Sequence, residues 1–141
     1  MKFKKLVENA HIPTYGSDAA AGADLYAAEG AVIKPGEMKL VDTGIAVAIP
    51  SGFFGAIFAR SGLATKQGLR PANCVGVVDA DYRGPVKVAL YNDSDKVREV
   101  QQGDRIAQFV IMPFMQEVYE EVDDLDKTER GAGGFGSTGV N

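Results

Sequence analysis

The residues with the most chemical potential in this sequence lie in NCVGVVDADYRGPVK, positions 73–87. Asp79 and Asp81 stand on either side of an alanine, and Tyr82 follows directly and offers a ring face. On a strand, residues two apart face the same side of the sheet, so the two carboxylates could converge. An ionised carboxylate can accept a proton from a bound water. The spacing favours a general-base site, and the alternative is a β-hairpin whose turn merely contains these residues.

A second candidate is ARSGLATK, positions 59–66, where Arg60 and Ser61 precede Gly62 at the start of the only stretch with helical character. A helix N-terminus presents unpaired N–H groups and a partial positive charge, which suits a phosphate group. An arginine beside it can add charge-assisted hydrogen bonds. Taken alone, Ser61 could equally be an ordinary helix N-cap.

Two shorter segments also combine polar side chains with apolar surroundings. AGADLYA, positions 21–27, sets Asp24 among small and apolar residues, and a turn aspartate that bonds its own backbone is the equal alternative. GDRIAQ, positions 103–108, begins as a turn and places Arg105 and Gln108 at the ends of a short apolar stretch.

The glycine-rich segment RGAGGFGSTGVN, positions 130–141, could be either a flexible tail or a loop that approaches a ligand closely. Gly131, Gly136 and Thr138 have the spacing of a Walker A phosphate loop. However, Ser137 stands where that motif requires lysine. The spacing therefore argues against a Walker A loop.

Composition narrows the function further. The net charge of −4 argues against nonspecific nucleic-acid binding, which needs a basic face. Cys74 is the only cysteine and His11 the only histidine, so a disulfide or a zinc site of usual composition is not expected. No apolar run approaches the ~20 residues of a membrane span. We expect a single soluble domain in the cytoplasm, with no membrane partner.

The elements that must position these residues are short strands. Runs of alternating or β-branched apolar residues, separated by Gly, Pro, Asn and Asp, predict antiparallel strands over 3–8, 39–50, 53–59, 86–92 and 105–112. The one helix candidate is 61–68, and 117–130 is interpreted as an edge strand that runs into a solvated connector. An all-β sandwich or jelly roll follows.

Taken together, five segments resemble, in order, the motifs of the trimeric dUTP pyrophosphatases (dUTPases). They are AGADL (21–25), RSGLATK (60–66), NCVGVVDADYRG (73–84), GDRIAQ (103–108) and RGAGGFGSTG (130–139). The resemblance spans nearly the whole chain. It implies a distorted jelly-roll β-barrel with one short helix, which assembles as a homotrimer with three active sites at subunit interfaces.

The resemblance also implies the reaction. The family hydrolyses dUTP to dUMP and pyrophosphate with Mg²⁺, by attack of water on the α-phosphorus, which supplies dUMP for thymidylate synthesis and keeps uracil out of DNA. By this resemblance Asp79 is the general base, and Gln108 bonds to a phosphate or to the catalytic water. Asp24 acts through water on a Mg²⁺ ion that the triphosphate itself carries, as suits the reluctance of magnesium to lose its waters.

The substrate contacts implied by the resemblance divide into nucleoside and phosphate groups. Asn73 and the backbone of Val77, Val78 and Asp79 would read the edge of uracil, in a hairpin without room for a 5-methyl group. Tyr82 would pack on the deoxyribose and exclude a 2′-hydroxyl, and Lys87 would contact the nucleotide. The phosphates would be held by Arg60, Ser61 and Gly62.

The resemblance gives the C-terminal segment a function. Residues 1–122 would form the jelly-roll domain, and 123–141 an arm, mobile when the site is empty, that spans up to ~60 Å when extended and crosses to a neighbouring subunit. Arg130 would approach the terminal phosphates and Phe135 would stack on uracil. Gly136, Ser137 and Thr138 complete the expected substrate-binding set.

Two alternatives remain at this point. One is a dCTP deaminase-like enzyme, which shares the fold, and the other is a trimeric regulatory binding protein. The run Asp79–Gly84 and the complete glycine-rich tail favour a dUTPase.

Overall fold

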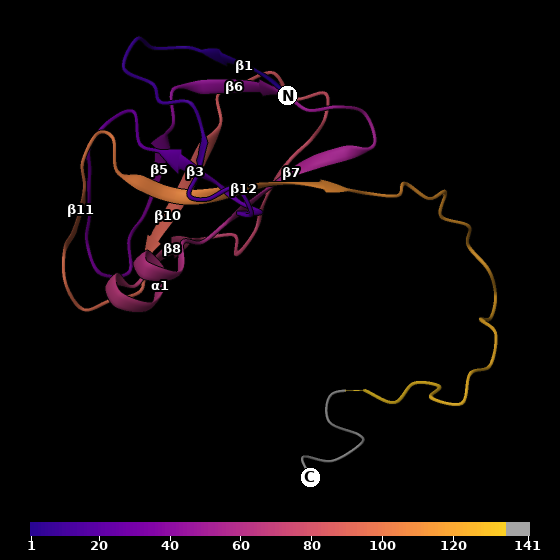
Figure 1. The fold of residues 1–141 in the computed structure, drawn as a ribbon. Coiled ribbons are helices and arrows are strands. Elements are labelled where there is room, and N and C mark those ends of the chain that lie inside the picture. The colour runs from indigo at the N-terminus through magenta and orange to yellow at the C-terminus, as the bar shows by residue number, and fades with distance from the viewer. Residues whose placement is uncertain (135–141) are drawn as a thin grey trace.

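The computed structural model describes residues 1–134, and the expectations that fall on residues 135–141 lie outside this part of the chain. Short strands wrap into a distorted barrel, with one helix at one end and the C-terminal segment leaving from the side (Figure 1). In chain order the elements are β1 (Lys2–Lys5), β2 (Thr14–Tyr15), β3 (Ala23–Tyr26), β4 (Ala31–Ile33), β5 (Met38–Asp42), β6 (Ile45–Ala48), β7 (Phe53–Phe58), α1 (Ser61–Gln67), β8 (Leu69–Pro71), β9 (Gly76–Val78), β10 (Lys87–Asn92), β11 (Arg98–Val100) and β12 (Arg105–Pro113).

The strands form four antiparallel sheets. The largest has the order β2-β3-β12-β7-β9, and a three-stranded sheet has the order β5-β10-β8. Two ribbons, β1-β6 and β11-β4, complete the barrel. The predicted all-β architecture with one short helix is confirmed.

Alternating side chains explain why these stretches are strands. In β10, Val88, Leu90 and Asn92 are buried, while the residues between them are less so. The inward side chains of all sheets meet in one core, which holds Leu25, Ile33, Val41, Ile45, Leu69, Val86, Val88, Leu90, Ile106 and Phe109. This burial is the main driving force that fixes strand register, since a shift by one residue would turn every apolar side chain outward.

Two local boundaries depend on glycine. The predicted helix over 61–68 is confirmed as α1, which ends where Gly68 adopts φ 69° and caps the helix. The strand predicted over 39–50 is wrong as a single element, because the chain bends at Gly44 between β5 and β6. Gly44 has φ 68°, and a Cβ atom there would lie 2.5 Å from the Val7 side chain.

No helix within residues 1–134 is long and apolar enough to cross a membrane.

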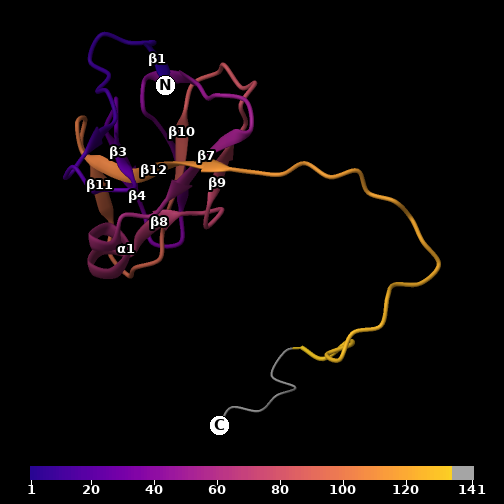
Figure 2. The ribbon, with the colours of Figure 1, turned by 45° about the vertical axis from the view of Figure 1, so that its right-hand side comes forward.

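The segment beyond β12 leaves the barrel. The Phe114 N–H donates to the Gly52 carbonyl, and residues 115–134 then run outward without helix or strand (Figures 1 and 2). Val118 and Tyr119 are 95% and 98% exposed. The edge strand predicted within 117–130 is therefore wrong in this chain, because no strand lies beside the segment to accept its hydrogen bonds. The solvated connector predicted there is confirmed.

Asn92 links three parts of the barrel at the end of β10. Its side chain is fully buried, and Nδ2 donates to the carbonyls of Ile33 at 2.8 Å and Lys96 at 2.7 Å. Its Oδ1 accepts from the backbone N–H and the hydroxyl of Ser94. The amide therefore donates two hydrogen bonds and accepts two, which neither aspartate nor leucine, the side chains of nearly the same shape, can do.

We expect Asn92→Asp to lower the free energy of unfolding by about 3 kcal/mol or more, because a carboxylate cannot donate to the two carbonyls and adds a buried charge. Urea unfolding at one protein concentration measures the loss. The matched control is Asn9→Asp, since Asn9 is exposed and makes one bond, to the Ala28 carbonyl. It should lose less than about 1 kcal/mol. Equal losses for the two variants would contradict this account of Asn92.

Candidate active site

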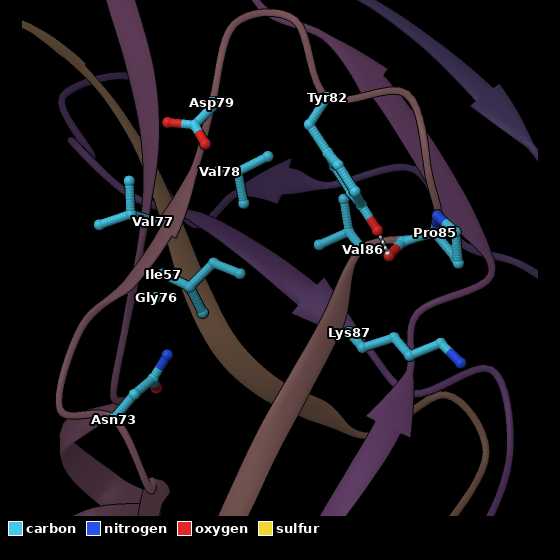
Figure 3. Close-up of a pocket in the computed structure, with 10 residues that line it drawn as sticks. All are labelled: Ile57, Asn73, Gly76, Val77, Val78, Asp79, Tyr82, Pro85, Val86 and Lys87. Carbon is cyan, nitrogen blue, oxygen red and sulfur yellow. Dashed lines mark hydrogen bonds between the residues drawn. The ribbon is translucent and has the colours of Figure 1, made fainter.

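The first half of the site is a cavity of about 260 Å³ between β9 and the start of β10 (Figure 3). The nucleoside-contacting residues predicted within 73–87 all line it, whereas Phe135, predicted to stack on uracil, lies outside the described residues. Its walls are Ile57, Asn73, Gly76, Val77, Val78, Asp79, Tyr82, Pro85, Val86 and Lys87. This volume is near the lower end for small-molecule sites, so it suits a base and sugar rather than a whole triphosphate.

The cavity exists because the expected hairpin does not close. β9 pairs with β7, whereas β10 pairs with β5 and β8, so the two strands belong to different sheets. The hairpin predicted for residues 73–87 is therefore wrong as a paired hairpin, because each strand finds its partner elsewhere in the barrel. β9 is the edge of its sheet, and an edge strand presents N–H and C=O groups that the sheet does not use. Val77, in the middle of β9, is 64% exposed.

Asn73 lies in the turn that leads into this edge strand. A Cβ atom added at Gly76 would lie 3.5 Å from Asn73 Nδ2 and 3.1 Å from Ile57 Cβ. Glycine at position 76 therefore lets the amide of Asn73 and the side chain of Ile57 come close to the strand backbone. Figure 3 shows the Asn73 side chain directed along β9 toward the cavity.

Asp79 and Tyr82 bracket the turn above the cavity. The Tyr82 N–H donates to the Asp79 carbonyl at 3.2 Å, and Asp79, Asp81 and Tyr82 are all exposed. β9 ends at Val78, so Asp79 and Asp81 lie in the turn and do not share a strand face. The convergence of two carboxylates expected from their spacing is therefore wrong. Asp79 alone borders the cavity.

The opposite wall carries Tyr82 and Lys87. The Tyr82 hydroxyl donates to the Pro85 carbonyl at 3.1 Å (Figure 3). Lys87 lines the cavity, while its Nζ lies 3.4 Å from Asp42 Oδ2. The ammonium group therefore faces a carboxylate on β5, and the stem is the part of Lys87 that faces the cavity.

The second half of the site is a cluster of two arginines around one buried carboxylate. Asp24, on β3, is 6% exposed. Its Oδ1 accepts from Arg60 Nε at 2.9 Å and its Oδ2 from Arg105 Nη1 at 3.3 Å. Arg60 Nη1 also donates to the Arg105 carbonyl at 3.2 Å. Gln108 pairs with Asp24 in the register of β12 and β3, so the strands bring these predicted residues together.

Arg105 is the member of this cluster to which the sequence assigned no function. Its position three residues before Gln108 in GDRIAQ is the only signal in the sequence. That spacing does not show which strand lies opposite, so the contact with Asp24 could not be predicted. Two guanidinium groups against one carboxylate leave a net positive charge, which suits an anion.

The residues present fit an indirect contact with magnesium better than a direct one. Both Asp24 oxygens already accept hydrogen bonds from arginines. Within residues 1–134 no group of three or more His, Cys, Asp or Glu side chains could hold a metal ion. A magnesium ion that keeps its waters and binds mainly to a ligand is compatible with this arrangement.

The two halves do not meet within one chain. β7 separates them, because Val78 of β9 lies opposite Gly55 while Gln108 of β12 lies opposite Phe58. Three residues along β7 correspond to about 10 Å, and Asp79 continues away from Phe58.

Arg130 is exposed in the outward segment, where its Nε donates to the Gly133 carbonyl. Phe135, Gly136, Ser137 and Thr138 lie outside the described residues.

Comparison with known proteins identifies the family. A family model described as dUTPase matches residues 8–139. The chain belongs to the dUTPase family. The resemblance inferred from the five motifs is confirmed, and the dCTP deaminase-like alternative is not supported.

Curated dUTPases match along most of their length. The deoxyuridine 5′-triphosphate nucleotidohydrolase of Nautilia profundicola is 50% identical over 139 residues, which cover 99% of this chain and 98% of the relative. That of Yarrowia lipolytica is 50% identical over 145 residues, covering 100% of this chain and 90% of the relative.

Solved dUTPases confirm the fold. The Staphylococcus bacteriophage 80alpha dUTPase, determined with dUPNHPP, has a TM-score of 0.91 at 30% identity and covers 99% of this chain and 98% of its own. A mutant dUTPase of phage phi11 of S. aureus, described with a structural Mg(II) ion, has a TM-score of 0.79 at 28% identity. It covers 87% of this chain and 96% of its own. The present dUTPase therefore has the jelly-roll fold predicted from its sequence.

Proposed function

We propose that this dUTPase hydrolyses dUTP to dUMP and pyrophosphate in a homotrimer, with Asp79 as the general base. The observation that carries this assignment is the cavity between the diverging strands β9 and β10. It combines an unpaired strand edge, a carboxylate at its mouth and an aromatic ring on its wall. The full-length match to nucleotidohydrolases of dUTP identifies the substrate class.

The unpaired edge of β9 recognises the base. Uracil and cytosine exchange an acceptor for a donor at one position, so fixed N–H and C=O groups of Val77, Val78 and Asp79 can distinguish them. Asn73, which lines the cavity, adds a side-chain amide. Discrimination by buried polar groups is strong, because the wrong base leaves a donor or acceptor without a partner. We expect the loop around this strand edge to leave no room for a 5-methyl group on the base.

The opposite wall of the cavity recognises the sugar. The Tyr82 ring packs on the deoxyribose and occupies the space that a 2′-hydroxyl would need. The stem of Lys87 contacts the nucleotide beside it. Support comes from the position of Tyr82, whose hydroxyl is bound to the Pro85 carbonyl and whose ring therefore faces the cavity with its apolar side.

Asp79 activates water at the mouth of the cavity. The water oxygen attacks the α-phosphorus, its proton passes to the Asp79 carboxylate, and the bond from the α-phosphorus to the bridging oxygen breaks. Pyrophosphate leaves as one unit. Asp79 is exposed and borders the cavity, so a water can reach it. Gln108 bonds to a phosphate or to the attacking water.

The arginine cluster holds the phosphates. Arg60 supplies charge, while Ser61 and Gly62 are exposed at the first turn of α1, where N–H groups point outward. Asp24 would hold Mg²⁺ through water beside the triphosphate, and the ion would supply positive charge that offsets the phosphates. The buried position of Asp24 between two arginines supports a contact through water rather than direct ligation.

A complete site needs more than one copy of the chain. Asp79 and Gln108 lie on opposite sides of β7, so a neighbouring subunit must bring its arginine cluster to the nucleoside cavity. The arm 123–141 then crosses to another subunit, with Arg130 at the terminal phosphates and Phe135 over uracil. The high exposure of Val118, Tyr119 and Leu125 supports this exchange, because these apolar side chains have no close packing in the described part of their own chain.

Pyrophosphate release from dUTP, dTTP, dCTP and UTP tests the proposal. We expect dUTP to be preferred by at least about 10²-fold over each of the others, since each carries one group that the cavity excludes or leaves without a partner. Ammonia released from dCTP would favour a deaminase. Binding of dUTP without pyrophosphate release would favour a regulatory binding protein.

A further inference from the structure

Gly84 lies close to the hydroxyl end of the Tyr82 ring. A Cβ atom at position 84 would lie 2.6 Å from Tyr82 Cζ and 3.0 Å from Cε2, and it would be closer still to the hydroxyl oxygen. Real Cβ atoms do not approach other atoms so closely. The present position of the ring therefore requires the absence of a side chain at position 84.

The backbone at this glycine does not require glycine. Its φ lies outside the left-handed region, unlike that of Gly44 or Gly68. An alanine at position 84 would therefore avoid left-handed strain, and the three atoms nearest to its Cβ all belong to the Tyr82 side chain. That side chain is 44% exposed, so it has room to move without disturbing the core.

The backbone of the turn is held separately. Arg83 Nη1 donates to the carbonyls of Ala80 at 2.6 Å and Tyr82 at 2.8 Å. These bonds fix the path of residues 80–82, so the remaining freedom of Tyr82 is rotation of its side chain. The single hydrogen bond from its hydroxyl to Pro85 cannot hold the ring against a steric conflict, because such a bond contributes little net free energy.

We propose that Gly84 is a positioning residue for sugar specificity in this enzyme. The missing Cβ lets the Tyr82 ring lie back against Pro85, and this position sets how closely the ring approaches carbon 2 of the sugar. The inference rests on the proposed function, in which Tyr82 packs on the deoxyribose. It assigns to Gly84 the control of ring position and leaves the exclusion of ribose to Tyr82.

Gly84→Ala is the direct test. We expect the ratio of kcat/KM for dUTP to that for UTP to fall by about tenfold or more, mainly through a higher KM for dUTP. The urea unfolding midpoint should stay that of the parent enzyme. The matched control is Gly16→Ala, since a Cβ at Gly16 would meet nothing within 4 Å. That variant should leave both the ratio and the midpoint unchanged.

A double-mutant cycle separates the inference from the function on which it rests. Tyr82→Ala alone should lower the dUTP-to-UTP ratio, and adding Gly84→Ala should lower it no further, because the conflicting ring is gone. If Tyr82→Ala lowers the ratio and Gly84→Ala does not, the inference fails while the proposed function stands. If Tyr82→Ala leaves the ratio unchanged, the sugar-reading function of Tyr82 fails first.

A rescue experiment tests whether the conflict between the added Cβ and the Tyr82 side chain causes the loss of sugar specificity. Tyr82→Phe removes the atom closest to the added Cβ, so Tyr82→Phe with Gly84→Ala should recover part of the lost ratio. An equal effect of Gly84→Ala in the parent enzyme and in the Tyr82→Ala variant would overturn the inference, since Gly84 would then act through another group. If the Gly84→Ala variant does not fold, the test is made in the Tyr82→Phe background. The double variant, Tyr82→Phe with Gly84→Ala, is then compared with Tyr82→Phe alone.

Discussion

Asp79→Asn should reduce the kcat for dUTP by about 10²–10⁴-fold while nucleotide binding persists. The amide keeps the shape of the carboxylate but cannot accept the proton of the attacking water. Asp79 is exposed at the end of β9, so the substitution should not disturb the core. Pyrophosphate release measures kcat, and titration with the imido analogue dUPNHPP measures binding.

The turn itself offers the control. Asp81 lies two residues further on, is also exposed, and does not line the cavity. Asp81→Asn should therefore retain kcat within a small factor. Undiminished turnover in Asp79→Asn would refute the assignment of the base, and a severe loss in Asp81→Asn alone would transfer the function to that residue.

Removal of the arm is expected to have the second largest effect. A chain that ends at Glu129 lacks Arg130 and Phe135, and its kcat/KM for dUTP should fall by about 10²–10³-fold, as when a charge-stabilising donor is lost. The barrel should keep its stability and its trimeric state, because residues 115–134 extend away from it. Turnover, urea unfolding and light scattering measure the three properties. A chain that ends at Gly139 keeps every predicted arm contact and should behave like the full chain.

Mixed trimers test whether the arm is exchanged between subunits. The Asp79→Asn chain has an intact arm, and the chain that ends at Glu129 has an intact base. If one subunit supplies its arm to the site of another, refolding the two inactive chains together should restore part of the dUTP turnover. An arm that folds back over its own subunit would give no recovery, because no site would then hold both an intact base and an arm.

Much of the barrel could be predicted from the sequence, because its strands alternate clearly. The strands predicted over 53–59, 86–92 and 105–112 match β7, β10 and β12 closely, since each has apolar residues that face the common core. The break at Gly44 was missed, because apolar residues continue on both sides of it. The strand expected in 117–130 was wrong, because a strand needs a partner and none lies beside it in this chain.

The site was predicted in its parts and not in its arrangement. Five motifs identified Asp24, Arg60 and Asp79, but strand pairing decides which residues meet. The divergence of β9 and β10 into different sheets, which creates the cavity, depends on long-range contacts that no local pattern records. The same holds for Arg105, whose contact with Asp24 arises from strands far apart in the sequence.

The charge of the arginine cluster has a consequence for how the proposed site is completed. Asp24 cancels one of its two arginines, so the cluster contributes a single net positive charge. A nucleoside triphosphate brings about four negative charges, two of them on its terminal phosphate. Its magnesium ion would offset two and Arg130 of the arm one more. The four charges of the triphosphate alone are therefore matched only when cluster, ion and arm are all in place, and the ion and the arm should strengthen each other's binding.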